Sequence, residues 1–363
     1  MDMSIVVAFV ITLLAGGAVG ALFLKFKAPG GMLVGSLLGA LVLNMTWGAA
    51  YVPVHGRILA QLTAGAFIGS SMSRSDIHRL KKIWKPALIV IGMHLLFTLF
   101  LGGVIYIVSP LDAATAYFSA VPGGMTEIPL ISADMGANAA KVVVMQFTRM
   151  LVALGVFPII IAWLSKKHDS KSPPTAGEPS EELAEEAPPP PGEKPGSNGT
   201  NALLTFALAL AAGLAGAAAG IPAGTLGFSI VAIVAFNLIC GRAYLPKWLR
   251  RLAQLLAGTF VGSSVSQSDL LEMRFLIVPA IILIAAYSLS LFSIGWLLRK
   301  ACPEMSMKES MLTALPAGAS DMALISMDMG VNSTNLVVLQ IARLVAVSVV
   351  FPQIISLVLW ILS

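Results

Sequence analysis

One segment of this chain occurs twice, and both copies carry helix-breaking and charged residues within an otherwise apolar sequence. Residues 120–158 and 314–352 align at an offset of 194, which pairs Pro122 with Pro316. The same offset relates further pairs: Gly124 with Gly318, Glu127 with Asp321, Asp134 with Asp328, Asn138 with Asn332, Gln146 with Gln340, and Arg149 with Arg343. A broken segment at corresponding places of two halves is the best sequence indication of a transport site in a membrane protein.

The composition requires a membrane environment. Hydrophobic residues make up 57% of the chain and charged residues 11%, with a mean hydropathy of +0.87, which is too apolar for a soluble globular protein. Several apolar runs approach the roughly 20 helical residues that cross a bilayer. The net charge of +5 does not indicate nucleic-acid binding, because the lysines and arginines mainly flank apolar runs, where they orient helices.

A polar segment divides the chain in two. Residues 166–200 are dominated by proline, glutamate and glycine, and a composition with so little to bury predicts a disordered linker. We therefore predict a first membrane repeat at 1–165 and a second at 201–363. The repeat extends beyond the duplicated segment, since residues 62–76 match 255–269 at an offset of 193, which also relates Asn44 to Asn237.

Each repeat contains six apolar segments. In the first repeat we place them near 4–24, 29–48, 57–73, 85–109, 111–136 and 138–165. In the second repeat we place them near 201–220, 222–241, 247–267, 275–299, 305–330 and 332–362. The first segment is expected to be an uncleaved helix, because Asp2 stands where a signal peptide has basic residues.

The basic residues indicate that the two repeats are inserted in opposite orientations. In the first repeat they follow the third segment, in a predicted loop that runs from Arg74 to Lys85. In the second repeat they precede the third segment, between Arg242 and Arg251. Because basic loops face the cytoplasm, we predict inverted repeats, with the linker in the cytoplasm and both termini outside.

Inverted repeats need an odd number of crossings, so one of the six segments does not span the bilayer. The fifth is the candidate, because Pro122-Gly123-Gly124 and Pro316-Ala317-Gly318 divide it into arms of about a dozen residues, too short to span. We predict a re-entrant hairpin in each repeat, with its tip near mid-membrane. The fold class is an all-α polytopic membrane protein of two inverted repeats, each with about five transmembrane helices and one re-entrant helical hairpin.

The hairpin tips form the predicted binding site for substrate or ion. Non-helical backbone at membrane depth occurs where protein or a watery cavity satisfies it, and such backbone binds anions or sodium ions. The alternative is a kink that only aids packing. The residues concerned are Pro122, Gly123, Gly124, Thr126 and Glu127 in the first repeat, and Pro316, Gly318, Ser320 and Asp321 in the second.

The two carboxylates beside the tips, Glu127 and Asp321, are the predicted coupling residues. An ionised carboxylate inside a bilayer costs at least ~2.5–3.5 kcal/mol, so each needs a partner, a coupling cation or a proton. The alternative role is stabilisation of a helix start by the macrodipole.

A second group of polar residues follows seven to eleven residues after these carboxylates. Asp134 and Asp328 precede glycines that end a helix, and they lie either at the wet end of a hairpin arm or in the site. Asn138 and Asn332 stand where the sixth helices begin, and capping is the favoured role for them.

Gln146 with Arg149, and Gln340 with Arg343, are three residues apart and share one helical face. Each arginine lies within an apolar helix, so its guanidinium group must face protein or water. Two roles remain open: the arginines bind an anionic solute through their planar fork, or they form structural ion pairs with Glu127 and Asp321.

Several function classes have no support in the sequence. It contains no G-x-x-x-x-G-K-[ST] phosphate loop, no H-E-x-x-H motif and no metal-ligand spacing around Cys240 and Cys302. His94 is isolated in an apolar segment. The serine-rich stretches at 69–76 and 262–269 are expected to serve helix packing. We therefore expect neither an enzyme nor a bound cofactor, apart from a coupling Na⁺ or H⁺.

The duplicated motif resembles that of the AbrB family of bacterial inner-membrane proteins. The residues that carry the resemblance are 122–142 with QFTR at 146–149, and 316–330 with QIAR at 340–343. The resemblance implies a multi-pass protein of the bacterial inner membrane, and family names attach both a regulatory role and an ammonia monooxygenase label. No copper or iron ligand set is visible. The family is also similar to elevator-type secondary transporters, with five helices and a re-entrant loop in each inverted half.

The sequence thus favours an ion- or proton-coupled secondary transporter of a small anionic or zwitterionic solute. The alternative is a membrane-embedded sensor or regulator that binds a ligand and signals through a partner. The expected partners are a small-molecule or ion substrate and the lipid bilayer, with a homodimer as the assembly to test, and no nucleic acid.

Overall fold

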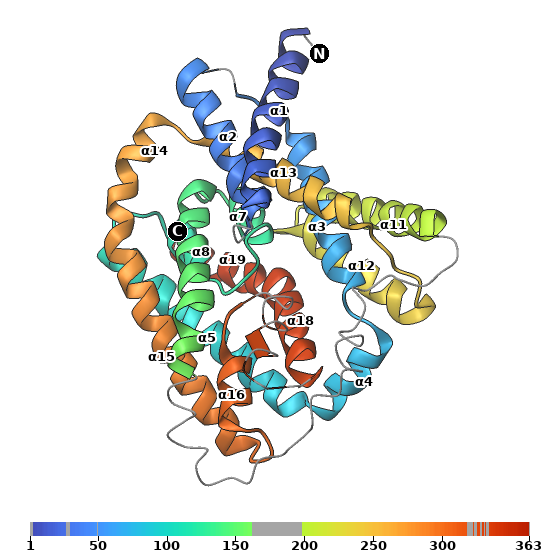
Figure 1. The fold of residues 1–363 in the computed structure, drawn as a ribbon, viewed down its shortest axis with the longest axis vertical. Helices are drawn as coiled ribbons and strands as arrows, with labels where there is room; N and C mark the ends of the chain where they lie inside the picture. Colours follow the sequence, from blue (N-terminus) through green and yellow to red (C-terminus); the bar gives the residue numbers. More distant parts are fainter. Residues whose placement is uncertain are drawn as a thin grey trace.

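The computed structural model describes residues 3–26, 30–48, 50–161, 198–317, 322, 325–326, 329, 331 and 334–362. Within these residues all regular secondary structure is helical (Figure 1). Most of the linker predicted at 166–200 lies outside the described residues, and α11 begins at its end, at Asn198.

The helices follow the predicted apolar segments closely. The first half contains α1 (Met3–Lys25), α2 (Gly31–Trp47), α3 (Val54–Ser70), α4 (Arg74–Lys82), α5 (Trp84–Val108), α6 (Ala113–Ser119), α7 (Glu127–Asp134) and α8 (Ala139–Gly155). The second half contains α11 (Asn198–Ala218), α12 (Gly224–Cys240), α13 (Lys247–Ser264), α14 (Gln267–Glu272), the 3-10 helix η2 (Met273–Leu276), α15 (Ile277–Ala301), α16 (Met307–Ala314), α18 (Thr334–Val349) and α19 (Phe351–Leu362).

Six of the described helical stretches are long and apolar enough to cross a membrane. They are Ile5–Lys25, Trp84–Val108, Ala139–Ile161, Gly199–Ala218, Gln267–Ala301 and Asn335–Leu362. Large apolar side chains also point outward, such as Phe100, which is 67% exposed, and Ile107, which is 82% exposed. Such surfaces suit contact with lipid. The chain is a helical polytopic membrane protein.

Two predictions about local structure were wrong. The stretch from Arg74 was expected as a loop, yet it forms α4, and its counterpart forms α14. Each helix starts with a capping box, in which Ser73 and Asp76, or Ser266 and Asp269, satisfy each other's backbone N–H groups. The S-x-x-D spacing carries this signal, and it gives the serine-rich stretches a capping role in addition to packing.

The two helices on either side of Pro122 are also shorter than the arms of about a dozen residues that were predicted. The helix α6 has 7 residues because Asp112 caps its start, and α7 has 8 residues because it ends before Gly136, which has a positive φ of 77°. The non-helical stretch between them, residues 120–126, is called the first break.

The helices assemble into two bundles. The first three long helices of each half, α1–α3 and α11–α13, pack mainly on one another and form bundle A. The helices α5–α8, α15, α16, α18 and α19 form bundle B. Bundle A lies at the top and right of Figure 1, and α4 and α14 lead from it into bundle B.

The two halves interlock inside bundle A. The side chain of Asn44, at the end of α2, donates to the carbonyl oxygens of Ser263 and Val265 at 3.2 and 3.0 Å. Its counterpart Asn237 donates to Ser70 and Met72 at 3.2 and 2.9 Å. Each asparagine thus satisfies the end of a helix that belongs to the other half.

Close backbone approach supports this interlocking. A Cβ atom at Gly262 of α13 would lie 2.2 Å from the carbonyl oxygen of Leu37 of α2, and one at Gly258 would lie 2.4 Å from that of Leu33. Only glycine allows helix backbones to come so close.

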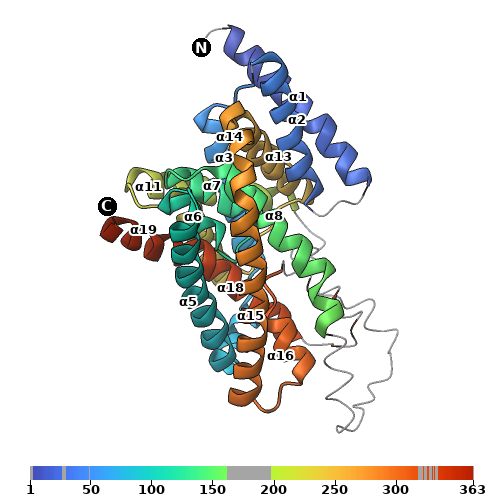
Figure 2. The same cartoon turned by 90° about the vertical axis from the view of Figure 1, so that its left-hand side faces the viewer.

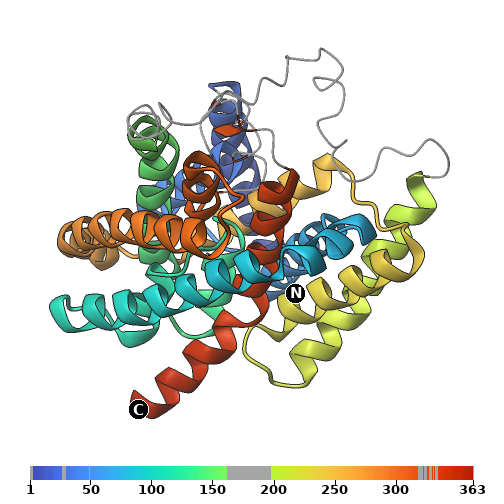
Figure 3. The same ribbon diagram turned by 90° about the horizontal axis from the view of Figure 1, so that it is seen from below.

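The equivalent helices α5 and α15 lie side by side and antiparallel in bundle B (Figures 2 and 3). Residues near the start of α5, such as Lys85, share a cavity with residues after the end of α15, such as Cys302. In the middle, His94 of α5 lies near Tyr287 of α15, its counterpart at offset 193.

Candidate functional site

The first break leaves backbone carbonyl groups without helical partners. The helix α6 ends at Ser119 and α7 begins at Glu127. Pro122 has no N–H group and its ring blocks a continuous helix. The carbonyl oxygens of Phe118 and Val121 accept only turn-type bonds there, from the N–H groups of Val121 and Gly123 at 3.4 and 3.0 Å. Further donors stabilise them, because under-satisfied carbonyl groups are costly at membrane depth.

Gln146 and Arg149 of α8 supply those donors. The amide of Gln146 donates to the oxygens of Phe118 and Val121 at 3.1 and 3.0 Å. Arg149 donates from Nη1 to Val121 at 3.2 Å and from Nη2 to Gly123 at 2.5 Å. Both side chains are buried, with Arg149 only 4% exposed, so they hold the break in one shape.

The second half repeats this arrangement. Gln340 donates to the carbonyl oxygens of Leu312, Thr313 and Leu315, each at 3.3 Å. Arg343 donates from Nη1 to Leu315 at 2.9 Å and from Nη2 to Ala317 at 2.6 Å. The second break, described at residues 315–317, contains the buried Pro316. Gly318, Ser320 and Asp321 lie outside the described residues.

These contacts give the arginines a role that neither sequence-based alternative named. Arg149 and Arg343 bind carbonyl groups of the breaks, directly after the negative C-terminal ends of the short helices α6 and α16. The described ion pairs do not include one between Arg149 and Glu127. The Nε atoms of both arginines are buried without a hydrogen-bond partner in the described residues.

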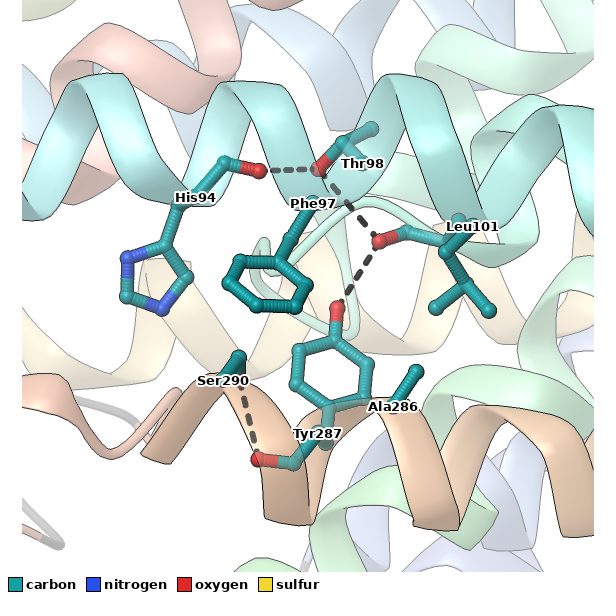
Figure 4. Close-up of a pocket in the computed structure, with 8 residues that line it drawn as sticks. His94, Phe97, Thr98, Leu101, Ala286, Tyr287 and Ser290 are labelled. Carbon is teal, nitrogen blue, oxygen red and sulfur yellow. Dashed lines mark hydrogen bonds between the residues drawn. The ribbon is translucent and has the colours of Figure 1, made fainter. Parts of the chain in front are cut away.

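Side chains of α5 and of α15, which belongs to the other half, also face the first break (Figure 4). The Tyr287 hydroxyl donates to the carbonyl oxygen of Ala120 at 2.8 Å, and Thr98 approaches the same oxygen at 3.5 Å. The Arg149 guanidinium lies 5.8 Å from the centre of the Tyr287 ring. A void of about 10 Å³, enough for one water molecule, lies between α5 and α15 here.

His94 occupies the place in the first half that Tyr287 has in the second. It is 1% exposed, and its Nδ1 atom lies 2.8 Å from the carbonyl oxygen of Val90. Its Nε2 atom is buried without a hydrogen-bond partner in the described structure. The centre of bundle B thus combines two guanidinium groups, one imidazole and one phenol around the two breaks.

Glu127 begins α7 beside the first break. Its carboxylate lies against Gly124, since a Cβ atom added there would be 1.8 Å from Oε2. Thr126 is 8% exposed and its side chain makes no capping hydrogen bond to α7. Glu127 lies in the first turn of α7, where the macrodipole favours a negative charge, and its carboxylate lies next to the backbone of Gly124.

Asp134 lies at the other end of α7 and binds bundle A. It pairs with Arg57 of α3 at 3.1 Å and accepts a hydrogen bond from Gln61 at 2.5 Å. The Arg57 guanidinium also lies 5.3 Å from the ring centre of Phe260, and the equivalent Arg250 lies 4.5 Å from that of Phe67. Asp134 therefore connects the two bundles.

Asn138 caps α8, as predicted, by accepting a hydrogen bond from the backbone N–H of Lys141 at 3.2 Å. Its amide also donates to Asp269 of the other half at 2.6 Å. Asp328 and Asn332 lie outside the described residues.

A comparison with protein-family models shows which family the chain belongs to. The family model described as "Transition state regulatory protein AbrB" matches residues 32–359. The chain belongs to the AbrB family.

Two relatives are similar over most of their length. The AbrB-family chain is 25% identical over 308 residues to the "Uncharacterized protein YhjN" of Bacillus subtilis (strain 168), covering 81% of this chain and 76% of the relative. It is 22% identical over 342 residues to the "Putative regulator AbrB" of Escherichia coli (strain K12), covering 92% and 91%.

Some residues of this AbrB-family site were not singled out in the sequence analysis. Arg57, Gln61 and Tyr287 belong to helices that are far from the duplicated motif in the sequence, although their positions obey the repeat offset. A polar residue in an apolar helix is a useful signal in such cases. Among the described residues, no cluster of His, Cys, Asp or Glu has the make-up of a metal site.

Proposed function

We propose that this chain is an ion- or proton-coupled secondary transporter of a small anionic or zwitterionic solute in the bacterial inner membrane. The observation that carries the proposal is the pair of helix breaks, one from each half, held by equivalent buried Gln–Arg pairs in the centre of bundle B. Broken helices at membrane depth serve as binding sites in transporters, because their free backbone groups replace water around the solute.

The proposal assigns separate tasks to the residues of the site. Arg149 and Arg343 keep the breaks open and supply positive potential, while the backbone near Gly123 and Gly124 contacts the solute. Glu127 and, by the repeat, Asp321 bind the coupling cation or proton. This division is supported by the hydrogen bonds that occupy the Nη atoms of both arginines.

The division into two bundles suggests how the binding site could open to one side of the membrane and then to the other. Bundle A is the part that stays fixed, and bundle B, with both re-entrant hairpins, moves across the membrane as in an elevator. Support comes from the antiparallel packing of the equivalent helices α5 and α15, as inverted repeats require. Further support comes from the short helices α4 and α14, which join the bundles at equivalent places.

Flux measurements test the proposal. The purified chain alone, in proteoliposomes with a Na⁺ or H⁺ gradient, is expected to accumulate a small anion or zwitterion. Glu127→Gln and Asp321→Asn are expected to abolish coupled uptake while the protein stays monodisperse in size-exclusion chromatography. Glu181→Gln is the control, because it removes a carboxylate from the predicted linker, far in the sequence from both breaks. Unchanged uptake in both site variants would reject the assignment.

The family description favours a second function, a membrane sensor that signals through a partner. The same breaks would then bind a ligand without moving it. Ligand binding by the purified chain combined with no flux in proteoliposomes would select this function over transport.

A further inference from the structure

A second polar cavity lies at the end of bundle B where α4 meets α5 and α15 meets α16, at the bottom of Figure 1. Its volume is about 410 Å³, within the range of small-molecule sites. It is called the basal cavity. None of the residues that hold the two breaks lines it.

The basal cavity carries both signs of charge. Lys82 and Lys85 line it from the α4–α5 side, while Glu304 in the loop after α15 and Glu309 of α16 line it from the other side. Lys82, Lys85 and Glu304 form no ion pair with another residue that the structure describes. Trp84 lies at the rim, with the Lys85 ammonium group 5.9 Å from its ring centre.

Cys302 lines the basal cavity together with Glu304 and Lys85. Burial raises the pKa of its thiol, the negative charge of Glu304 raises it further, and the positive charge of Lys85 opposes both. The sulfur therefore lies within electrostatic range of the carboxylate and of the ammonium group. A molecule in the cavity would therefore experience both signs of charge.

We propose that the basal cavity binds a small zwitterion, such as an α-amino acid. The lysines attract its anionic group and Glu304 attracts its ammonium group. A simple anion would be repelled by Glu304, and a simple cation by Lys82 and Lys85. Only a molecule that carries both charges can pair with the lysines and with the carboxylate at the same time.

This inference rests on the proposed function, because it names the solute class and a waiting site at one mouth of the transporter. Asn335 and Leu339 of α18 line the inner wall of the cavity. Leu339 directly precedes Gln340, which holds the second break. The helix α18 thus contacts the cavity through Leu339 and the second break through the next residue, Gln340. The basic α4 places this mouth on the cytoplasmic side.

Thiol labelling of the full-length protein tests the inference. The chain has two cysteines, so Cys240→Ser leaves Cys302 as the single reporter in the cavity. Its reaction with methyl methanethiosulfonate is followed by intact mass against rising concentrations of glycine, L-glutamate or L-lysine. Because a ligand at ten times its Kd leaves about one tenth of the sites empty, the bound zwitterion should slow labelling about tenfold.

Two sets of controls make the result specific. Acetate and methylammonium, each with one of the two charges, are expected to give no protection at the same concentrations. Lys82→Ala with Lys85→Ala, and separately Glu304→Gln, are expected to lose the protection. Lys81→Ala is the matched control, since this exposed lysine of α4 does not line the cavity, and it should keep full protection.

The outcomes separate this inference from the proposed function. Absence of protection by all three amino acids, or equal protection by acetate, would overturn the zwitterion site even if coupled flux is found. Protection that follows the phosphatidylethanolamine content of a nanodisc, and not the soluble probes, would also overturn it. Saturable protection by an amino acid supports it, whether or not Glu127→Gln stops flux.

Discussion

The hydroxyl group of Tyr287, in the second half of the chain, donates a hydrogen bond to the carbonyl oxygen of Ala120, in the first half, at 2.8 Å. This bond satisfies the first break from outside its own repeat. The break is therefore held from two sides, by α8 of its own half and by α15 of the other.

Removal of that hydroxyl should weaken the assembly of the two halves. Tyr287→Phe leaves the buried Ala120 carbonyl with only the long contact from Thr98, which should cost about 1–3 kcal/mol of unfolding free energy. Thermal unfolding in detergent measures the loss. Tyr106→Phe is the control, because Tyr106 is 41% exposed, and equal losses for both variants would contradict the role of Tyr287.

Replacement of either buried arginine, Arg149 or Arg343, by lysine should destabilise the protein. The guanidinium fork of Arg149 reaches two carbonyl oxygens at once, whereas an ammonium group on a flexible stem cannot hold both in that geometry. Arg149→Lys and Arg343→Lys should each lower stability by about 1.5–3 kcal/mol, the range for hydrogen bonds to charged groups.

The matched control is Arg79→Lys on the exposed side of α4, which should melt like the parent protein. A melting temperature for Arg149→Lys that equals that of Arg79→Lys would show that the fork does not hold the break.

The position of the Glu127 carboxylate should depend on the absence of a side chain at residue 124. Gly124→Ala would place Cβ 1.8 Å from Oε2 and displace the carboxylate. Coupled uptake should fall as far as in Glu127→Gln. Gly103→Ala, where the nearest atom to the new Cβ would be 3.5 Å away, should leave uptake unchanged, and a fully active Gly124→Ala would argue against Glu127 as the coupling residue.

The Arg57–Asp134 pair should couple the two bundles weakly and in a salt-dependent way. The side chains are 23% and 20% exposed, so a double-mutant cycle with Arg57→Met and Asp134→Asn should give a coupling energy of about 0.5–1 kcal/mol. Because the pair is partly screened, the coupling should shrink between low and high salt. A coupling of zero at low salt would mean that α7 does not depend on this contact for its place against bundle A.

The sequence predicted the elements well and their partners poorly. Pro122, Gly123 and the repeat located the break, because a proline in an apolar helix has a strong local effect. The helix end at Gly136 was predicted, but the late start of α6 after its N-cap Asp112 was not.

The partner of Arg149 shows what spacing cannot reveal. The sequence places Gln146 and Arg149 on one helical face, but it does not say which groups that face meets. The structure supplies backbone carbonyl groups, which have no sequence signature of their own. In the same way, Arg57 was overlooked because its partner Asp134 is 77 residues away and on another bundle.

The reciprocal bonds made by Asn44 and Asn237 have a consequence for how the protein is made. The carbonyl groups of Ser70 and Met72 lack these donors until Asn237 has been synthesised and inserted. When only the first repeat has been synthesised and inserted, the end of α3 still lacks these two hydrogen bonds. The first repeat therefore completes its fold only after α12 of the second repeat has entered the membrane.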